Sequence, residues 1–256
     1  MGMYVGAAWS GKGWFGATVT SSDGWTYELY PTLWSLHRAH PDAEFVLIDV
    51  PIGLPEPGDG RRRCDEHAKR LLGPRHSSVF YTPVRPAVYE RSLARAKEVN
   101  EAAGYSIQNQ AWSLVPRIRE VDEFLDAHSE ARDRFRETHP EVCYHALHGA
   151  ALDQSPNSAS AVEERLEILR DVAPDAAGAF RDAVETYTQP RFAPLVTEPI
   201  DILDGFVAAI TARRFPDVAT LPRGSPTDGR GLPMEIVYPG DDRQLTLGDL
   251  GAIDEN

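Results

Sequence analysis

The segment 45–55 constrains the fold more than any other. It begins with an apolar run, residues 45–48, that ends at the acidic residue Asp49. The apolar run before Asp49 is typical of a strand buried on both faces of a sheet, and Pro51 and Pro55 prevent the strand from continuing. Asp49 is therefore expected at the carboxyl end of a strand, where open α/β sheets build ligand sites. Such a carboxylate needs a cation or hydrogen-bond donors, because an unpaired buried ion is costly. The alternative is that Asp49 accepts hydrogen bonds from the turn amides around residues 52–53.

The segments around this strand predict an α/β protein with a mixed sheet flanked by helices. Three short strands are expected at 3–9, 14–20 and 25–30, and turn-forming residues between them favour an antiparallel meander. A helix to about residue 39 then leads into the Asp49 strand. This β-β-β-α-β order opens a ribonuclease H-like fold, although other mixed sheets begin in the same way.

The length and apolar content fit one domain over residues 1–256, with a helical insertion at 61–130 that covers the sheet edge. Residues 142–148 fit either a helical turn or a strand. The later residues from 241 are expected to fray. Further elements are expected as helices at 89–103, 116–127, 159–172, 175–187 and 199–212, and as strands at 132–138 and 234–238.

The charge composition is strongly acidic. The chain has 39 Asp and Glu residues, a net charge of −13 and only three lysines. Such a surface suits molar salt, where charges are screened within about 3 Å, so a halophilic source is expected. No apolar run approaches the roughly 20 residues that cross a bilayer, and no secretory signal is visible, so a cytoplasmic protein without membrane contact is expected. The two distant cysteines indicate neither a disulfide framework nor a zinc site.

Further carboxylates lie near the ends of later elements. Glu137 and Glu141 flank the end of a short strand, while Asp201 and Asp204 share one face near a helix start. A helix that crosses the sheet would bring that face to Asp49. Sites built from carboxylates alone favour Mg²⁺ or Mn²⁺, and two such ions can align water for phosphodiester hydrolysis.

Each of these acids also has a structural interpretation. Asp201 is a suitable helix cap, and Glu137 and Glu141 are equally compatible with surface charge in so acidic a chain. His139, which precedes a proline, suits a structural role or one that supports a metal ligand. Asp204 lies inside its helix among apolar residues, so capping explains it less well.

Residues 61–85 contain a cluster of basic side chains. Planar guanidinium groups such as Arg62, Arg63 and Arg75 suit phosphate oxygens and can hold a nucleic-acid backbone. The alternative is that these arginines pair with nearby acids. Gln110 lies in a patch rich in amides and aromatic rings, which suits either base contacts or packing.

Taken together, these motifs resemble domain-of-unknown-function family 429, whose members are predicted nucleases of ribonuclease H-like fold. The resemblance spans about residues 3–239, and the acidic composition marks a haloarchaeal type. It implies a nuclease dependent on Mg²⁺ or Mn²⁺, with Asp49, Glu137 and Asp204 as catalytic metal ligands and Asp201 and Glu141 close by. The motifs are residues 48–55, 63–65, 68, 72–73, 77–80, 110–112, 121–122, 137–141, 201 and 204–205.

One departure from the family pattern concerns the first strand, which resembles Gly-Val-Asp followed by a glycine-rich turn and Gly-Trp. Aligning Gly13 and Trp14 with that pattern places Ala8 where the aspartate is expected. Fold relatives use this aspartate as a central metal ligand, so its loss implies weak metal binding or lost catalysis. The alternative function is therefore a catalytically degenerate protein that binds nucleic acid or another ligand. A third possibility is the broader fold kinship with sugar kinases and actin-like ATPases, but the sequence shows no glycine-rich phosphate-binding loop of the required type.

Overall fold

A mixed sheet of five strands forms the centre of the computed structural model, which describes residues 2–11, 13–22, 24–154, 158–187, 189–192 and 198–240. The strands are β1 (Met3–Ser10), β2 (Gly13–Thr20), β3 (Trp25–Tyr30), β4 (Phe45–Ile48) and β5 (Phe135–Glu137). Their order is β3-β2-β1-β4-β5, with the first three antiparallel and with β4 and β5 parallel to β1. This arrangement confirms the predicted mixed α/β sheet and agrees with a ribonuclease H-like architecture.

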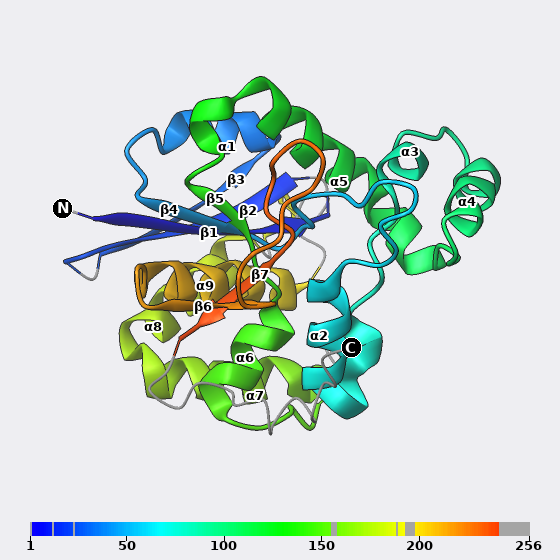
Figure 1. Ribbon diagram of the computed structural model, residues 1–256. Coiled ribbons are helices and arrows are strands. Elements are labelled where there is room, and N and C mark those ends of the chain that lie inside the picture. The colour runs from blue at the N-terminus through cyan, green and yellow to red at the C-terminus, as the bar shows by residue number, and fades with distance from the viewer. Residues whose placement is uncertain are drawn as a thin grey trace.

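Helices cover both faces of this sheet (Figure 1). On one face lie α1 (Leu33–Ala39) and α5 (Asn109–Ala127). The other face carries α6 (Pro140–His148), α7 (Ala159–Val172), α8 (Pro174–Tyr187) and α9 (Pro199–Arg213). The sheet is thus buried on both sides, as the apolar run before Asp49 predicts.

The chain between β4 and β5, where the sequence predicts an insertion at 61–130, is helical. It contains α2 (Arg63–Leu72), a 3₁₀ turn (Gly73–Ser78), α3 (Arg85–Val88), α4 (Leu93–Ala102), α5 and a second 3₁₀ turn (Ser129–Ala131). Figure 1 shows α3 and α4 to one side of the sheet, while α2 lies beside α6. Within this segment α5 packs on one face of the sheet, whereas α3 and α4 lie to one side of it.

Successive side chains along the strands belong to two different parts of the core, one on each face of the sheet. Trp14 belongs to the same core cluster as α1 residues such as Leu33, whereas its neighbour Phe15 contacts Tyr187 of α8 and Phe206 of α9. Successive side chains of a strand point to opposite faces, so both faces of β2 can be apolar and buried.

Helix α9 lies so close to β1 that only glycine fits where they cross. A Cβ atom on Gly6 would lie 2.0 Å from the backbone nitrogen of Ala209 and 2.4 Å from the carbonyl oxygen of Gly205. A Cβ atom on Gly205 would lie 2.7 Å from Cδ1 of Phe15. The small residues on both elements thus allow α9 to cross the sheet, as its sequence predicts.

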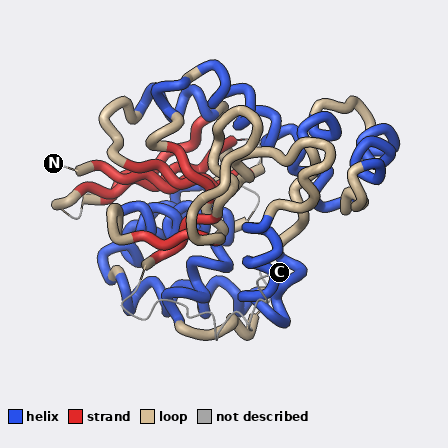
Figure 2. The backbone as a smooth tube through the Cα atoms, viewed as in Figure 1, coloured by secondary structure: helices blue, strands red, loops and turns tan. Residues whose placement is uncertain are grey.

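A second sheet pairs β6 (Val218–Leu221) with β7 (Ile236–Pro239) in antiparallel register. The strand expected at 234–238 corresponds to β7, whereas β6 was not expected. An isolated bridge between Thr138 and Val237 joins β7 to the chain just after β5. In Figure 2 a long loop connects β6 to β7 across the front of the molecule. Residues from 241, which were expected to fray, lie outside the described residues.

Within the described part of the chain, no helix combines the length and the apolar content needed to span a membrane.

Candidate functional site

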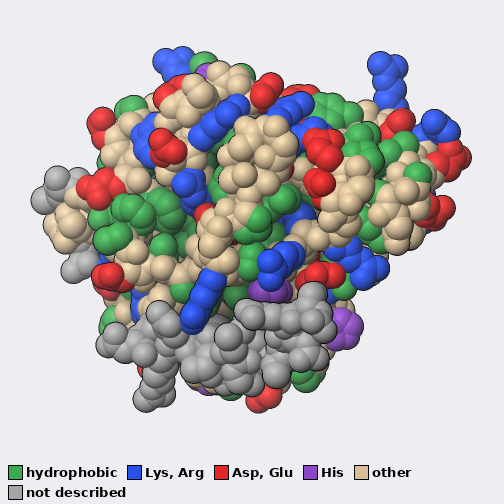
Figure 3. All heavy atoms as spheres, viewed as in Figure 1, with side chains coloured by type: hydrophobic (Ala, Val, Ile, Leu, Met, Phe, Trp, Pro, Cys, Tyr) green, Lys and Arg blue, Asp and Glu red, His purple; other side chains and the backbone are tan. Residues whose placement is uncertain are grey.

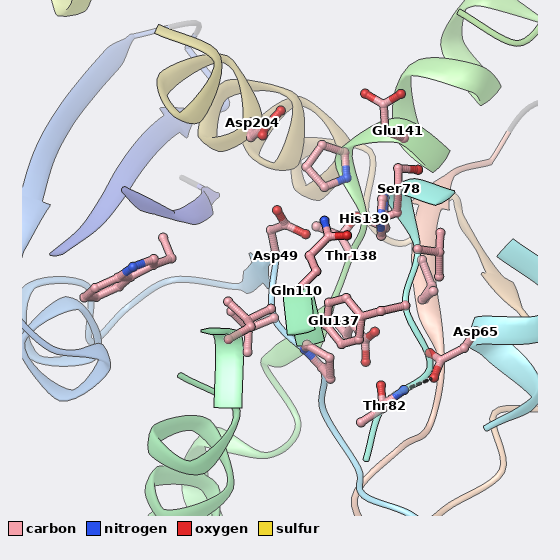
Figure 4. Close-up of a pocket in the computed structure, with 18 of the residues that line it drawn as sticks. Asp49, Asp65, Ser78, Thr82, Gln110, Glu137, Thr138, His139, Glu141 and Asp204 are labelled. Carbon is pink, nitrogen blue, oxygen red and sulfur yellow. Dashed lines mark hydrogen bonds between the residues drawn. The ribbon is translucent and has the colours of Figure 1, made fainter. Parts of the chain in front are cut away.

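A cavity of about 530 Å³ lies where the parallel strands end. Its walls include Asp49 directly after β4, residues 137–141 after β5, Asp204 on α9 and Gln110 at the start of α5. Figure 4 shows these side chains converging from separate elements. This is the edge at which ligand sites form in α/β sheets, and the Asp49 segment predicts it.

Asp49 and Asp204 are the carboxylates of this cavity for which the described residues supply neither a hydrogen bond nor an ion pair. Neither side chain accepts a hydrogen bond from any residue that the structure describes. Burial raises the pKa of Asp49 well above its usual value, and the nearby acids Asp204 and Glu137 raise it further. Burial also raises the pKa of Asp204, with Glu141 adding to the shift. Their oxygens are therefore available to a cation that would offset the repulsion.

Glu137 is engaged in a buried ion pair. Its two carboxylate oxygens accept hydrogen bonds from Nη1 and Nη2 of Arg62 at 2.7 and 2.8 Å, and one of them also accepts from the backbone nitrogen of Ile52 at 2.7 Å. The Arg62 guanidinium also binds Asp65 and the carbonyl oxygens of Ile52 and Gly53. Burial raises the pKa of Glu137, and Arg62 opposes that shift. Glu137 thus holds the turn that follows Asp49.

Glu141 and Asp201 also have protein partners. Glu141 pairs with Arg165, whose side chain is completely buried. Asp201 accepts hydrogen bonds from the backbone nitrogen of Glu198 and from the hydroxyl of Ser10, at 3.3 and 3.2 Å. Asp201 is therefore the N3 residue of a capping box at the start of α9, and the N-cap position, which the sequence suggests for Asp201, is occupied by Glu198.

The donor set fits one divalent cation better than two. Within the described residues, no group of three or more His, Cys, Asp or Glu side chains is arranged to hold a metal ion. Asp49 and Asp204 suit a single Mg²⁺, because this ion keeps several waters and needs only one or two carboxylates besides substrate phosphate. The site therefore lacks the further carboxylates that a pair of bridged ions needs.

Ala8 lies next to Asp49 in the sheet. The backbone nitrogen of Asp49 donates to the carbonyl oxygen of Ala7 at 3.0 Å, so the following residue, Ala8, flanks it on β1. Ala8 is buried, and it shares the α9 side of β1 with Gly6 and Ser10. An aspartate at this position would bring a further carboxylate towards Asp49 and Asp204.

The predicted substrate-binding residues lie in different environments. Arg62 and Arg75 line the cavity together with Gln110, whereas Arg63 is exposed on α2 and does not. Arg62 is occupied by its buried ion pairs, as the alternative reading of the basic cluster predicts. Arg75 donates to the carbonyl oxygens of Leu152 and Asp153 at 3.1 and 2.8 Å.

The sequence assigns no individual role to several lining residues, and it does not reveal the acids that surround Arg85. The cavity also exposes rings and hydroxyls of residues such as Trp9, Phe80 and Ser113. Outside it, Arg85 binds Glu56, Asp122 and Asp228. These three acids lie far apart in the chain, so spacing alone could not connect them with Arg85.

The pKa of His139 is lowered by burial, which favours a neutral ring.

Fold and site together define a mixed α/β protein with an acidic cavity at the carboxyl edge of its sheet. The chain belongs to the DUF429 family, described as proteins of unknown function, whose family model matches residues 10–226. No curated protein and no solved structure matches the chain.

Proposed function

We propose that the protein hydrolyses phosphodiester bonds of a nucleic acid with the help of one divalent cation held by Asp49 and Asp204. The observation that supports this proposal is a pair of carboxylates that no described residue binds, brought into one cavity from the end of β4 and from α9. Mg²⁺ or Mn²⁺ bound there would polarise a phosphoryl oxygen and lower the pKa of a coordinated water.

The other charged residues of the site orient these two carboxylates. Arg62 and Glu137 fix the turn after Asp49 through the backbone of Ile52. Asp204 stays in place because Asp201 caps the same helix. The negative charge of Asp204 adds to the raised pKa of Asp49, so ionising both carboxylates is unfavourable without a counter-charge. A cation or a proton must therefore balance this part of the cavity.

A combined binding and cleavage experiment tests the proposal. Calorimetric titration with MnCl₂ should show one site, and labelled DNA and RNA oligonucleotides should be cleaved only when Mn²⁺ or Mg²⁺ is present. Asp49→Asn and Asp204→Asn should each lose binding and cleavage, whereas Asp182→Asn on the exposed side of α8 should keep both. Absent manganese binding, or binding unchanged by Asp49→Asn, would overturn the assignment.

The second candidate is a degenerate relative that binds nucleic acid or another ligand without cleaving it, and Ala8 favours it. If a first-strand carboxylate is what this site has lost, Ala8→Asp should tighten manganese binding and restore cleavage of the oligonucleotides. An Ala8→Asp protein that folds but binds manganese with unchanged affinity would count against degeneracy.

The charge composition supports a further proposal about the setting of the protein. An excess of acids with few lysines suits a cytoplasm with molar salt, and thus a haloarchaeal-type family member.

A further inference from the structure

We infer that the substrate is a single strand whose phosphates lie along three cations at the mouth of the cavity. These cations, Arg61, Lys69 and Arg75, are called the cationic rim below. The inference rests on the proposed function and adds the form of nucleic acid that the site accepts. Figure 3 shows Lys and Arg side chains at the surface over α2, the helix that carries Lys69.

The rim cations are positioned by neutral partners. Lys69 donates to the carbonyl oxygens of His76 and Val79, and Arg75 donates to those of Leu152 and Asp153. None of the three rim cations forms an ion pair with a carboxylate among the described residues. Asp65 acts on Lys69 from beyond ion-pair distance, but no described carboxylate pairs directly with a rim cation, so these positive charges are held in place in a chain whose net charge is −13.

An aromatic ring joins two of the rim cations. The Arg61 guanidinium lies 4.1 Å from the centre of the Tyr81 ring, and Nζ of Lys69 lies 4.9 Å from the same centre. Cation–π contacts of this kind orient a guanidinium while leaving its N–H groups free for phosphate oxygens. Two like charges held on one ring favour an anion as their ligand.

The rim is continuous with the cavity. Arg75 itself lines the cavity, as does Val79, the residue that holds Lys69. Asp65, which lies one turn before Lys69 on α2, also lines it. A strand whose phosphates contact the rim can therefore continue towards Asp49.

The inside of the cavity favours unpaired bases. Trp9 and Phe80 line it and are partly exposed. The Arg117 guanidinium lies over one face of the Trp9 ring, 4.0 Å from its centre, so a base can stack on Phe80 or on the other face of Trp9. The faces of bases are accessible only in an unpaired strand. The cavity volume of about 530 Å³ falls within the range of sites that enclose a small ligand. It admits a few nucleotides of a single strand, whereas a duplex stays outside and does not reach Asp49.

The same helix provides a matched control. Arg63 and Arg70 lie seven residues apart on the exposed side of α2 and form no ion pair with any described carboxylate. Helical geometry places them away from Asp65 and Lys69, and neither of them lines the cavity. They match Arg61 and Arg75 in charge but lie off the inferred path.

The test measures binding alone, by fluorescence anisotropy in EDTA, with labelled 20-nucleotide DNA and RNA strands and with duplexes of the same sequence. Single strands should bind at least tenfold more tightly than duplexes. Each phosphate contact adds about 0.7 to the salt slope for single strands, so Arg61→Gln with Arg75→Gln should lower that slope by about 1.4 and weaken binding about 25-fold at 0.1 M salt. Arg63→Gln with Arg70→Gln should leave both values unchanged.

Melting curves of each variant verify that it is folded. If Arg61→Gln with Arg75→Gln melts early, Arg61→Gln alone should still weaken binding about fivefold at 0.1 M salt. Equal affinity for duplexes, or an equal loss in the control pair, would overturn the inference. Competition by polyglutamate as strong as that by the strand would instead indicate an acidic protein partner. A protein that binds strands but never cleaves them refutes the proposed function and leaves this inference intact.

Discussion

Asp49 is a half-buried carboxyl group that has no hydrogen-bond or ion-pair partner among the described residues, and ionising it destabilises the folded protein. Its pKa is raised above the ordinary value of 3.8, so between that value and the raised one the folded state holds a proton that the unfolded state has released. Stability therefore falls as the pH rises through this window. A bound cation would remove this cost, because it favours the ionised form.

The first prediction follows from this linkage. In EDTA at neutral pH, Asp49→Asn should melt at a higher temperature than the unmodified protein, and the difference should narrow as the pH falls towards 3.8. Adding Mn²⁺ should raise the melting temperature of the unmodified protein and leave that of Asp49→Asn unchanged. Thermal melting with and without Mn²⁺ checks both statements. A lower melting temperature for Asp49→Asn in EDTA would contradict them.

The second prediction concerns Arg62. Arg62→Ala leaves Glu137 and Asp65 buried without their cation, so we expect a loss of about 3–5 kcal/mol in the free energy of unfolding. Its exposed neighbour provides the control, because Arg63→Ala should change this free energy by less than about 0.5 kcal/mol. Urea unfolding followed by circular dichroism measures both. A loss at Arg62 as small as that at Arg63 would show that this network does not hold the turn after Asp49.

At the scale of elements, the crossing of α9 over β1 is what brings Asp204 to the cavity. Gly6→Ala should destabilise the protein by about 1–3 kcal/mol, because a Cβ atom there meets the backbone of α9. It should also weaken manganese binding, since α9 must shift. Gly178→Ala on α8 should instead stabilise by about 1 kcal/mol, because that position has open space and alanine favours a helix. A neutral Gly6→Ala would refute the close crossing.

Elements with strong local signals were predictable from the sequence. Alternation and turn residues gave β1, β2 and β3 almost to the residue, and small residues indicated α9. Helix α5 begins at Asn109 rather than at Pro116, because packing of residues such as Ala111 and Val115 outweighs the hydrogen bond that an internal proline removes. β6 was missed because four residues near Pro222 carry little pattern, and its pairing with β7 is distant in sequence.

The site was predictable only where a local pattern marks it. The apolar run and the prolines identify Asp49. Asp204 lies inside α9 and not at its first turn, so helix capping does not explain its position. The partner of Glu137 could not be read from the sequence, because Arg62 lies 75 positions away and only the fold brings the two together. Ion pairs of this kind depend on tertiary structure, so the sequence alone does not distinguish Glu137 from Glu141.

At the scale of the whole molecule, the net charge of −13 predicts a stability that depends on salt. Self-repulsion weakens as ions screen it, so the melting temperature should rise with KCl and level off near 1 M, where the screening length is about 3 Å. Scanning calorimetry across a KCl series checks this. A melting temperature no lower in dilute buffer than in concentrated KCl would contradict salt adaptation.

The proposed cation ties β4, α9 and the cavity into one functional unit. A crystal soaked in MnCl₂ and measured at the manganese absorption edge tests this most directly. We expect one anomalous peak between the carboxylates of Asp49 and Asp204, with waters completing its coordination and with Glu137 still bound to Arg62. An empty cavity at saturating manganese, or a peak held by other residues, would contradict the account.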